Sequence, residues 1–266
     1  MSTNHSVTVS ILLPFYNEED CLHEAIEGII GQTFRDWELL LLNDCSTDRS
    51  REIALEYSKS DNRICLIDSV LNLGQVGVLN LGMGYAKGEF LAFCDADDVW
   101  MEKKLELQLG LFRRKEVGMV CGLSRYRRIG SSWRSSATPR YGQIIYQRLL
   151  WGNCIGFSTL VVRREISIPL FEVLGPGIVH QDYIFILRLL QQNSSAIVEE
   201  VPEVVAEIGL RKGISSNKFR AMKSQWLILR QVANLSFIGT GLRFFYYLGF
   251  VFYKRGMGTI IKMLRV

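Results

Sequence analysis

Gly-Glu-Phe-Leu-Ala-Phe-Cys-Asp-Ala-Asp-Asp-Val-Trp, residues 88–100, is the stretch of sequence that decides the fold. Its short apolar run, rich in Phe and Leu and bounded by a glycine, predicts a buried strand over 90–94. Three carboxylates, Asp95, Asp97 and Asp98, follow that run. Side chains at i and i+2 of an extended chain point to the same side, so Asp95 and Asp97 are expected together at the end of the strand.

The paired carboxylates predict a divalent cation, because two neighbouring negative charges repel each other. Mg²⁺ or Mn²⁺ fits best, since these ions bind through one or two carboxylates plus substrate phosphates. The alternative is an N-cap for a helix expected near Met101. We assign that role to Asp98. It does not account for Asp95, so the metal–diphosphate interpretation is favoured.

The composition indicates a folded cytosolic protein of one large domain, or one domain with an appendage. Of 266 residues, 48% are apolar and 22% charged, which suffices for a core and excludes a disordered chain. The polar start shows no signal peptide. The six cysteines are scattered without a Cys-x-x-Cys pair and the three histidines are not clustered, which excludes a disulfide framework, a zinc site and a His-based metal site.

The charge is unevenly distributed. Residues 208–266 hold 11 Lys and Arg and no Asp or Glu, so the rest of the chain holds 20 basic and 27 acidic residues, a net charge of −7. This asymmetry indicates that the C-terminal part meets an anionic surface.

Strands and helices alternate along the first half of the chain. Helices are expected over 18–32 (capped by Asn17), up to about 58 (capped by Ser46 or Thr47), 76–86 (closed by Gly88) and 102–115. Strands are expected over 7–13 (ended by Pro14), 37–42, 63–67, 90–94 and 117–122. The alternation predicts a parallel α/β sheet with ligands at the carboxyl edge of its strands.

The pattern is looser beyond Gly122. Residues 124–140 predict a long functional loop or an irregular hairpin. A short strand is expected over 159–162, a helix opens at 180–183, and two short strands over 196–201 and 204–208 are broken at Pro202.

The tail from 219 to 266 is helical by pattern. Its ten-residue aromatic tract, 244–253, is flanked by Arg243 and by Lys254 and Arg255. A bilayer span needs about 20 residues, so the tract predicts a helix lying in the interface of an anionic membrane. A core-packing or dimer-forming helix stays open as the alternative. We therefore divide the chain into a catalytic domain, 1–215, and a helical extension, 216–266.

Five motifs over residues 7–215 resemble those of the family 2 glycosyltransferases, which have the GT-A fold. They are Pro14-Phe15-Tyr16-Asn17-Glu18-Glu19, Asn43-Asp44-Cys45-Ser46-Thr47-Asp48, Asn72-Leu73-Gly74 followed by Asn80 and Gly82, Asp95-Ala96-Asp97, and Gln181-Asp182. Each motif alone is weak, but five in this order and spacing are specific.

The resemblance implies a nucleotide-sugar donor, often a UDP-sugar. Pro14, Phe15 and Tyr16 would flank the base, Glu18 and Asp95 would lie near the ribose, Asp44 would bind the base edge, and Asp97 would ligate the metal. The other motif positions assigned to the donor site are Asn72, Gly74, Asn80, Ala96 and Arg211. Asp182 would be the base that deprotonates the acceptor, giving inversion; its other role is that of a helix-N-terminal aspartate.

Three positions depart from the family pattern. Leu79 stands where an arginine often precedes the asparagine, Gln181 replaces a glutamate, and no histidine occurs between 208 and 216. A diphosphate contact is therefore missing or comes from Arg211 and Lys212, which resemble a basic loop that closes over the donor.

The expected function is that of a metal-dependent, inverting hexosyl- or N-acetylhexosaminyl-transferase, peripheral on the inner face of the cell membrane. Its expected acceptor is a lipid-linked or surface glycan. A sugar nucleotidyltransferase is disfavoured because an acidic segment follows the first strand, where that class has a basic Gly-rich loop. A dinucleotide-binding oxidoreductase is disfavoured because Gly82-Met83-Gly84 is not followed by the third glycine of that motif. A nucleic-acid-binding module is disfavoured because the sequence contains no DNA- or RNA-binding motif. A non-catalytic sugar-nucleotide-binding homologue remains the alternative.

Overall fold

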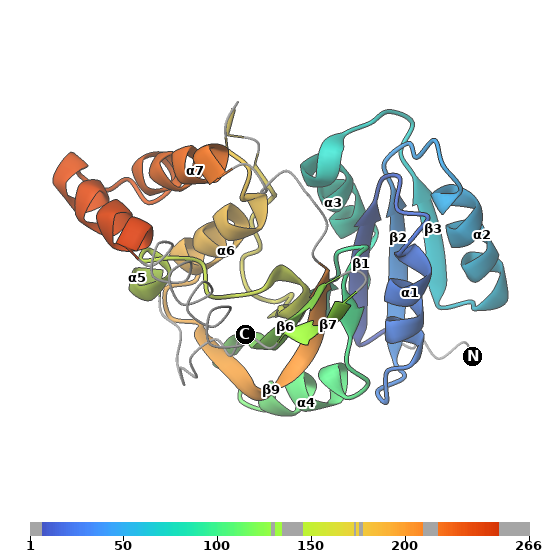
Figure 1. The fold of residues 1–266 in the computed structure, drawn as a ribbon. Coiled ribbons are helices and arrows are strands. Elements are labelled where there is room, and N and C mark those ends of the chain that lie inside the picture. The colour runs from blue at the N-terminus through green and yellow to red at the C-terminus, as the bar shows by residue number, and fades with distance from the viewer. Residues whose placement is uncertain are drawn as a thin grey trace, which may run out of the picture.

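The structure, a computed structural model, describes residues 7–128, 131–134, 146–172, 174–175, 178–209 and 218–249. Within these ranges one nine-stranded sheet has the order β3-β2-β1-β4-β8-β6-β9-β5, with β7 paired to β6. Helices cover both faces of this sheet (Figure 1). The α/β class expected from the sequence is confirmed.

The first half is the predicted parallel unit. Its strands are β1 (Val9–Phe15), β2 (Trp37–Asn43), β3 (Ile64–Asp68) and β4 (Phe90–Phe93), and its helices are α1 (Leu22–Ile30), α2 (Ser50–Ser60) and α3 (Gly74–Tyr85). The prediction that Pro14 ends the first strand is wrong, because β1 continues through Phe15. The pairing of β4 with β1 stops at Leu12, so the missing N–H of Pro14 interrupts no ladder on that side.

Beyond β4 the sheet becomes mixed. β8 (Val161–Arg163) pairs antiparallel with both β4 and β6 (Val117–Arg128), and β9 (Ile197–Gly209) is parallel to β6. β7 (Ser131–Arg134) forms a hairpin with β6, so the described part of 124–140 is the irregular hairpin of the two alternatives. The two-residue β5 (Val99–Trp100), which the sequence did not predict, pairs with β9.

The predicted break at Pro202 is wrong, because β9 is continuous over 13 residues. Its pairing with β6 jumps from Val201 to Val204, so Pro202 and Glu203 are accommodated as an irregularity in register. A proline can occupy such a bulge because no ladder hydrogen bond needs its N–H.

Alternate side chains of each strand face two separate cores. Ile11 and Leu13 pack with α1, α2 and α4 (Lys104–Leu111), whereas Leu12 packs with α3, α6 (Gln181–Gln192) and α7 (Lys218–Gln231). The prediction that Gly88 closes α3 is wrong, because α3 ends at Tyr85. A Cβ at Gly88 would lie 2.4 Å from the backbone nitrogen of Ser10, so glycine is needed there for close packing against β1.

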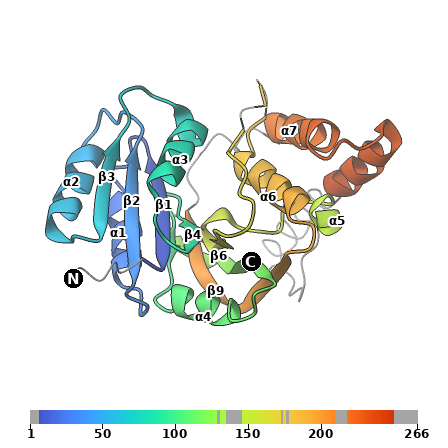
Figure 2. The same cartoon turned by 180° about the vertical axis from the view of Figure 1, so that it is seen from behind.

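Part of the helical tail packs on the core. α6 and α7 lie side by side in both views of the ribbon (Figures 1 and 2). Ile228 and Leu229 of α7 are fully buried among the side chains of α6. A further helix over 237–249 follows, and α5 (Tyr146–Leu149) and the 3-10 turn η1 (Phe157–Thr159) lie earlier in the chain. Within the described ranges, every helix is too short or too polar to span a bilayer. The division at residue 215 stays a prediction.

Candidate active site

The strand order places a crevice beside the carboxyl end of β1. Because β1 lies between β2 and β4, the chain runs outward on one side of β1 and later returns to the other. Ligands of open α/β sheets bind at such switch points. A cleft of about 400 Å³ opens there. It is lined by Pro14, Phe15, Tyr16, Glu18, Asp44, Asn72, Gly74, Gln75, Val78, Asp95, Ala96 and Asp97.

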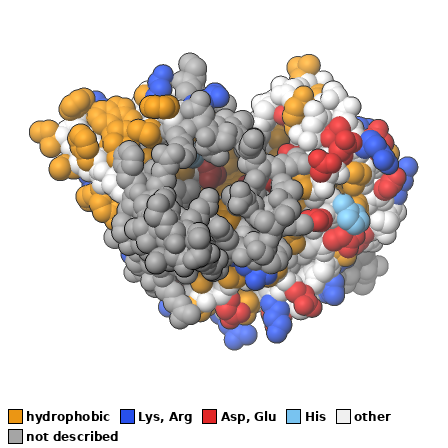
Figure 3. Space-filling model, in the orientation of Figure 1, with side chains coloured by type: hydrophobic (Ala, Val, Ile, Leu, Met, Phe, Trp, Pro, Cys, Tyr) orange, Lys and Arg blue, Asp and Glu red, His pale blue; other side chains and the backbone are white. Residues whose placement is uncertain are grey.

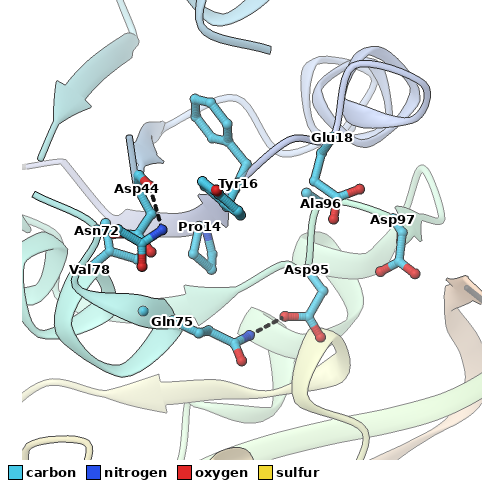
Figure 4. Close-up of a pocket in the computed structure, with 12 residues that line it drawn as sticks. Pro14, Tyr16, Glu18, Asp44, Asn72, Gln75, Val78, Asp95, Ala96 and Asp97 are labelled. Carbon is cyan, nitrogen blue, oxygen red and sulfur yellow. Dashed lines mark hydrogen bonds between the residues drawn. The ribbon is translucent and has the colours of Figure 1, made fainter. Parts of the chain in front are cut away.

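Ten of these twelve lining residues are predicted site residues. Figure 4 shows Asp44 and Asn72 at one end of the cleft, Asp95 and Asp97 at the other, and Pro14 between the two ends. Gln75 and Val78 are lining residues that the sequence analysis missed. Their signal was available, since Gln75 ends the turn that contains Gly74 and Val78 lies in the first turn of the helix predicted over 76–86.

Asp44 is fixed by backbone bonds from two neighbouring elements. Its Oδ1 accepts a hydrogen bond from the Leu73 N–H at 2.6 Å, and its own N–H donates to the Phe15 carbonyl at 3.0 Å. The Asn72 side chain donates to the Asp44 carbonyl at 3.2 Å (Figure 4). Gly74 starts α3 with a φ of +69°, which favours glycine, and so turns the helix N-terminus, an anion-favouring end, into the cleft.

Asn17 joins the loops that follow β1 and β2. It has a φ of +56°, and its Oδ1 accepts hydrogen bonds from the N–H groups of Thr47 at 2.8 Å and Asp48 at 3.3 Å. Its predicted role as a helix cap is wrong, because α1 begins only at Leu22. Nor does Ser46 or Thr47 cap α2. Instead, Asp48 accepts from the N–H of Ser50 at 3.0 Å.

The acidic end of the cleft carries concentrated negative charge. Asp95 accepts from the Gln75 side chain at 3.1 Å (Figure 4) and donates its N–H to the Ser158 hydroxyl at 3.0 Å. Burial raises the pKa of Asp95 well above its usual range, and the negative charges of Asp98, Asp97, Asp182 and Glu18 add to that shift. Such mutual repulsion favours a bound cation.

The acidic end suits a metal ion that is bound jointly by protein carboxylates and by phosphate oxygens of a ligand, rather than by protein side chains alone. Among the described residues, no three His, Cys, Asp or Glu side chains are grouped to hold an ion by themselves. Mg²⁺ and Mn²⁺ bind readily to one or two carboxylates when phosphate oxygens complete the coordination. The donor set at Asp95 and Asp97 therefore fits an ion that arrives with a diphosphate.

Asp98 is not the predicted helix cap, because α4 begins at Lys104 and Asp98 is 2% exposed. It accepts hydrogen bonds from the Ser158 hydroxyl and, at 2.8 Å, from the Gly209 N–H. Burial raises its pKa to about 7. A Cβ at Gly209 would lie 2.4 Å from Asp97 Oδ2. Asp98 thus holds the end of β9 directly against Asp97.

Asp182 lies in the first turn of α6, outside the set that lines the cleft. The Asn153 side chain donates to its Oδ2 at 3.5 Å. Burial raises the pKa of Asp182, and hydrogen bonding from the Tyr183 backbone and the charge of His180 act in the opposite direction. The negative charge of Asp182 is one of those that raise the pKa of Asp95, so Asp182 lies near the acidic end of the cleft.

One predicted donor residue, Asn80, is not among the residues that line the cleft. Asn80 uses both ends of its amide on Phe171: Oδ1 accepts from the backbone N–H at 2.8 Å and Nδ2 donates to the carbonyl at 3.0 Å. A donor contact from Asn80 would require breaking these bonds. Arg211 lies outside the described residues.

This sheet, with its cleft at the switch point and its acidic loop, defines a transferase of the GT-A class. The chain belongs to glycosyl transferase family 2, whose family model matches residues 10–168. The resemblance drawn from the five motifs is therefore confirmed.

Curated relatives match along most of the chain. The UDP-Glc:alpha-D-GlcNAc-diphosphoundecaprenol beta-1,3-glucosyltransferase WfgD of Escherichia coli is 33% identical over 83% of this chain and 85% of its own length. The putative teichuronic acid biosynthesis glycosyltransferase TuaG of Bacillus subtilis is 30% identical over 89% of this chain and 92% of its own.

Solved structures share the fold at low sequence identity. TarS 1-349 of S. aureus in complex with UDP-GlcNAc has a TM-score of 0.63 at 16% identity, covering 91% of this chain and 71% of TarS 1-349. The mannosyltransferase PcManGT of Pyrobaculum calidifontis, in complex with GDP-Man and Mn²⁺, has a TM-score of 0.64 at 17% identity, covering 86% and 64%.

Proposed function

We propose that the protein transfers a sugar from a UDP-sugar to a hydroxyl of a lipid-linked or surface-glycan acceptor, with inversion at the anomeric carbon. The observation that carries the proposal is the cleft at the switch point, which gathers residues from four sequence motifs. WfgD, whose name states a UDP-glucose donor and a diphosphoundecaprenol-linked acceptor, supports the choice of substrates.

The donor nucleotide would bind between Tyr16 and Asp44. Tyr16 is 47% exposed and its ring can stack on a base. The free face of the Asp44 carboxylate would accept hydrogen bonds from the base edge, and Glu18 would bind the ribose. The diphosphate would then extend toward Asp95, past the N-terminus of α3.

Mg²⁺ or Mn²⁺ would be held by Asp97 and would neutralise charge on the departing nucleoside diphosphate. Asp95, fixed by Gln75 and Ser158, would orient the ribose side of the donor. The backbone of Gly209, held by Asp98, would keep Asp97 in place.

Asp182 would act as the general base. A raised pKa makes its carboxylate a better proton acceptor than an exposed aspartate. From the acceptor side of the site, it would take the proton from the attacking hydroxyl as that oxygen approaches the anomeric carbon opposite the diphosphate. That in-line geometry gives inversion.

The test is a transfer assay with purified protein, labelled UDP-sugars and lipid-linked acceptors, together with UDP-binding calorimetry. We expect Asp182→Asn to abolish transfer with little change in UDP affinity. Asp97→Asn should abolish transfer and remove the dependence of UDP affinity on Mn²⁺. Glu165→Gln, an exposed carboxylate on another part of the surface, is the control.

Each alternative has its own outcome. Metal-dependent UDP binding without transfer to any acceptor would indicate the non-catalytic homologue. Formation of a UDP-sugar from UTP and a sugar phosphate would indicate the nucleotidyltransferase. Substantial transfer by Asp182→Asn would remove Asp182 from the role of base, and UDP binding indifferent to both metals would overturn the metal-dependent mechanism.

The location follows from the tail. We propose that the protein is peripheral on the inner face of the cell membrane, because residues 208–266 carry basic side chains and no acidic ones. Cell fractionation tests this proposal: truncation before Leu242 should move the protein from the membrane to the soluble fraction. Wild-type protein found wholly in the soluble fraction would contradict it.

A further inference from the structure

Three side chains from two distant segments of the chain meet after α5. The Arg243 guanidinium lies over the Trp151 ring, 5.2 Å from its centroid, and the Tyr246 ring meets Trp151 edge-on at 5.1 Å. Trp151 follows α5, whereas Arg243 and Tyr246 belong to the helix over 237–249. Cation–π and aromatic contacts thus hold a cation at a defined place on the surface.

The guanidinium is incompletely used. Its Nη1 donates to the Gly239 carbonyl at 3.3 Å, but the buried Nε finds no acceptor among the described residues. Arginine has five donors in a planar fork that matches phosphate oxygens, and buried donors are rarely left without a partner. Among the described residues, the Nε–H of Arg243 is therefore a donor whose acceptor a bound anion could supply.

The cluster is linked through the chain to the proposed base, Asp182. Trp151 is two residues before Asn153, whose side chain reaches Asp182 at 3.5 Å. Cα atoms two residues apart are separated by no more than about 7 Å. Trp151 therefore belongs to the segment that reaches the proposed base, and neither Trp151 nor Arg243 is among the residues that line the donor cleft.

An apolar stripe begins next to the cation. Ile238, Leu242 and Phe245 share one helix face and are 76%, 64% and 73% exposed. Phe237, at the start of the same helix, and Phe219, at the start of α7, are 71% and 85% exposed, and Figure 3 shows hydrophobic side chains gathered over α7 and the last helix. Trp226 packs edge-on against Phe237 and Phe244 and so secures the stripe to α7.

The order of chemistry along this surface is base, cation, apolar stripe. We propose that Arg243, braced by Trp151 and Tyr246, binds the phosphate next to the acceptor sugar, while the stripe of Ile238, Leu242 and Phe245 lies against its lipid. A sugar joined to a lipid through a diphosphate presents hydroxyl, anion and hydrocarbon in the same order. The inference rests on the proposed function for the class of acceptor and adds a binding site to it.

The direct test measures binding of a short-chain prenyl diphosphate to the full chain by calorimetry, with UDP and Mn²⁺ saturating the donor cleft. Arg243→Gln should weaken binding about tenfold or more, which corresponds to about 1.4 kcal/mol. Lys223→Gln, which removes an exposed positive charge from α7, should stay within about twofold of wild type. Arg243→Lys should retain part of the affinity because it keeps the charge.

The matching prenyl alcohol separates a phosphate site from a purely structural role. All variants should bind the alcohol alike. Equal weakening of alcohol and diphosphate binding by Arg243→Gln, or no weakening of either, would overturn the inference. UDP affinity serves as the check on folding, and Arg243→Lys repeats the comparison if Arg243→Gln fails that check.

Anionic vesicles separate the acceptor phosphate from bilayer headgroups. If Arg243→Gln reduces sedimentation with phosphatidylglycerol vesicles but leaves prenyl-diphosphate binding intact, the side chain binds headgroups and the inference is wrong. Wild-type protein that binds no UDP or transfers no sugar would refute the proposed function. If its binding of the prenyl diphosphate still depended on Arg243, the site inferred here would remain valid.

Discussion

Replacing Asn17 should loosen the contact between the loop that carries Glu18 and the loop that follows Asp44. The Asn17 Oδ1 accepts hydrogen bonds from the Thr47 N–H, the Thr47 hydroxyl and the Asp48 N–H. A net value of about 0.5–1.5 kcal/mol applies to each such bond, and the partial exposure of this corner favours the low end. Asn17→Gly should therefore lower the free energy of unfolding by about 1–2 kcal/mol.

Backbone strain adds to that loss in a second variant. At a φ of +56°, a Cβ without a polar side chain costs roughly 1 kcal/mol. Asn17→Ala should thus be about 1 kcal/mol less stable than Asn17→Gly. The difference between the two variants isolates the conformational cost from the lost hydrogen bonds.

Urea unfolding and UDP calorimetry together measure both effects. We expect UDP affinity to fall about fivefold in each variant, equivalent to about 1 kcal/mol, because the segment that carries Tyr16 and Glu18 is held less firmly against Thr47 and Asp48. Asn62→Ala, in an exposed turn, is the control. Wild-type stability of Asn17→Gly, or unchanged UDP affinity in both variants, would refute the reasoning.

Two further predictions concern the core. Burial lowers the pKa of Lys104 from 10.5 to about 7, so the unfolded chain binds one more proton between these values and stability rises with pH. In urea titrations, the free energy of unfolding of wild type relative to Lys104→Met should therefore rise by about 1.4 kcal/mol per pH unit between roughly pH 7.5 and 9.5. A difference between the two proteins that does not change with pH would contradict a neutral Lys104. Gly88→Ala should cost about 1–3 kcal/mol because its Cβ meets the Ser10 backbone, whereas Gly84→Ala, with open space, should cost nothing. Equal stability of the two variants would contradict this prediction and would show that the β1 backbone shifts to accommodate the added Cβ.

Much of the sheet was predictable because its strands are continuous apolar runs. The four parallel strands and their helices were found from periodicity, and the carboxyl ends of the strands from the polar residues that follow them. The two-residue β5 was missed because Val99 and Trp100 are too few to show a period. Pro202 misled the analysis because a register shift in β9 tolerates it.

The errors at the site share one cause. Asn17, Ser46, Thr47 and Asp98 were each assigned to the nearest helix, since caps are local and sequence patterns are local. In the structure, Asn17 and Asp98 bind segments about 30 and 111 residues away. Asn80 likewise binds Phe171, 91 residues on. Such long-range bonds leave no periodic trace in a single sequence.

The seam between β4 and β8 has an evolutionary consequence. All residues lining the cleft come from positions 14–97, while Trp151, Asp182 and Arg243 come from beyond the seam. Across the seam, Asp98 accepts hydrogen bonds from the Gly209 backbone N–H and the Ser158 hydroxyl, and a Cβ at position 209 would meet Asp97. Exchange of the second half between relatives would therefore preserve the acidic end of the cleft only where the incoming half supplies a serine at 158 and a glycine at 209.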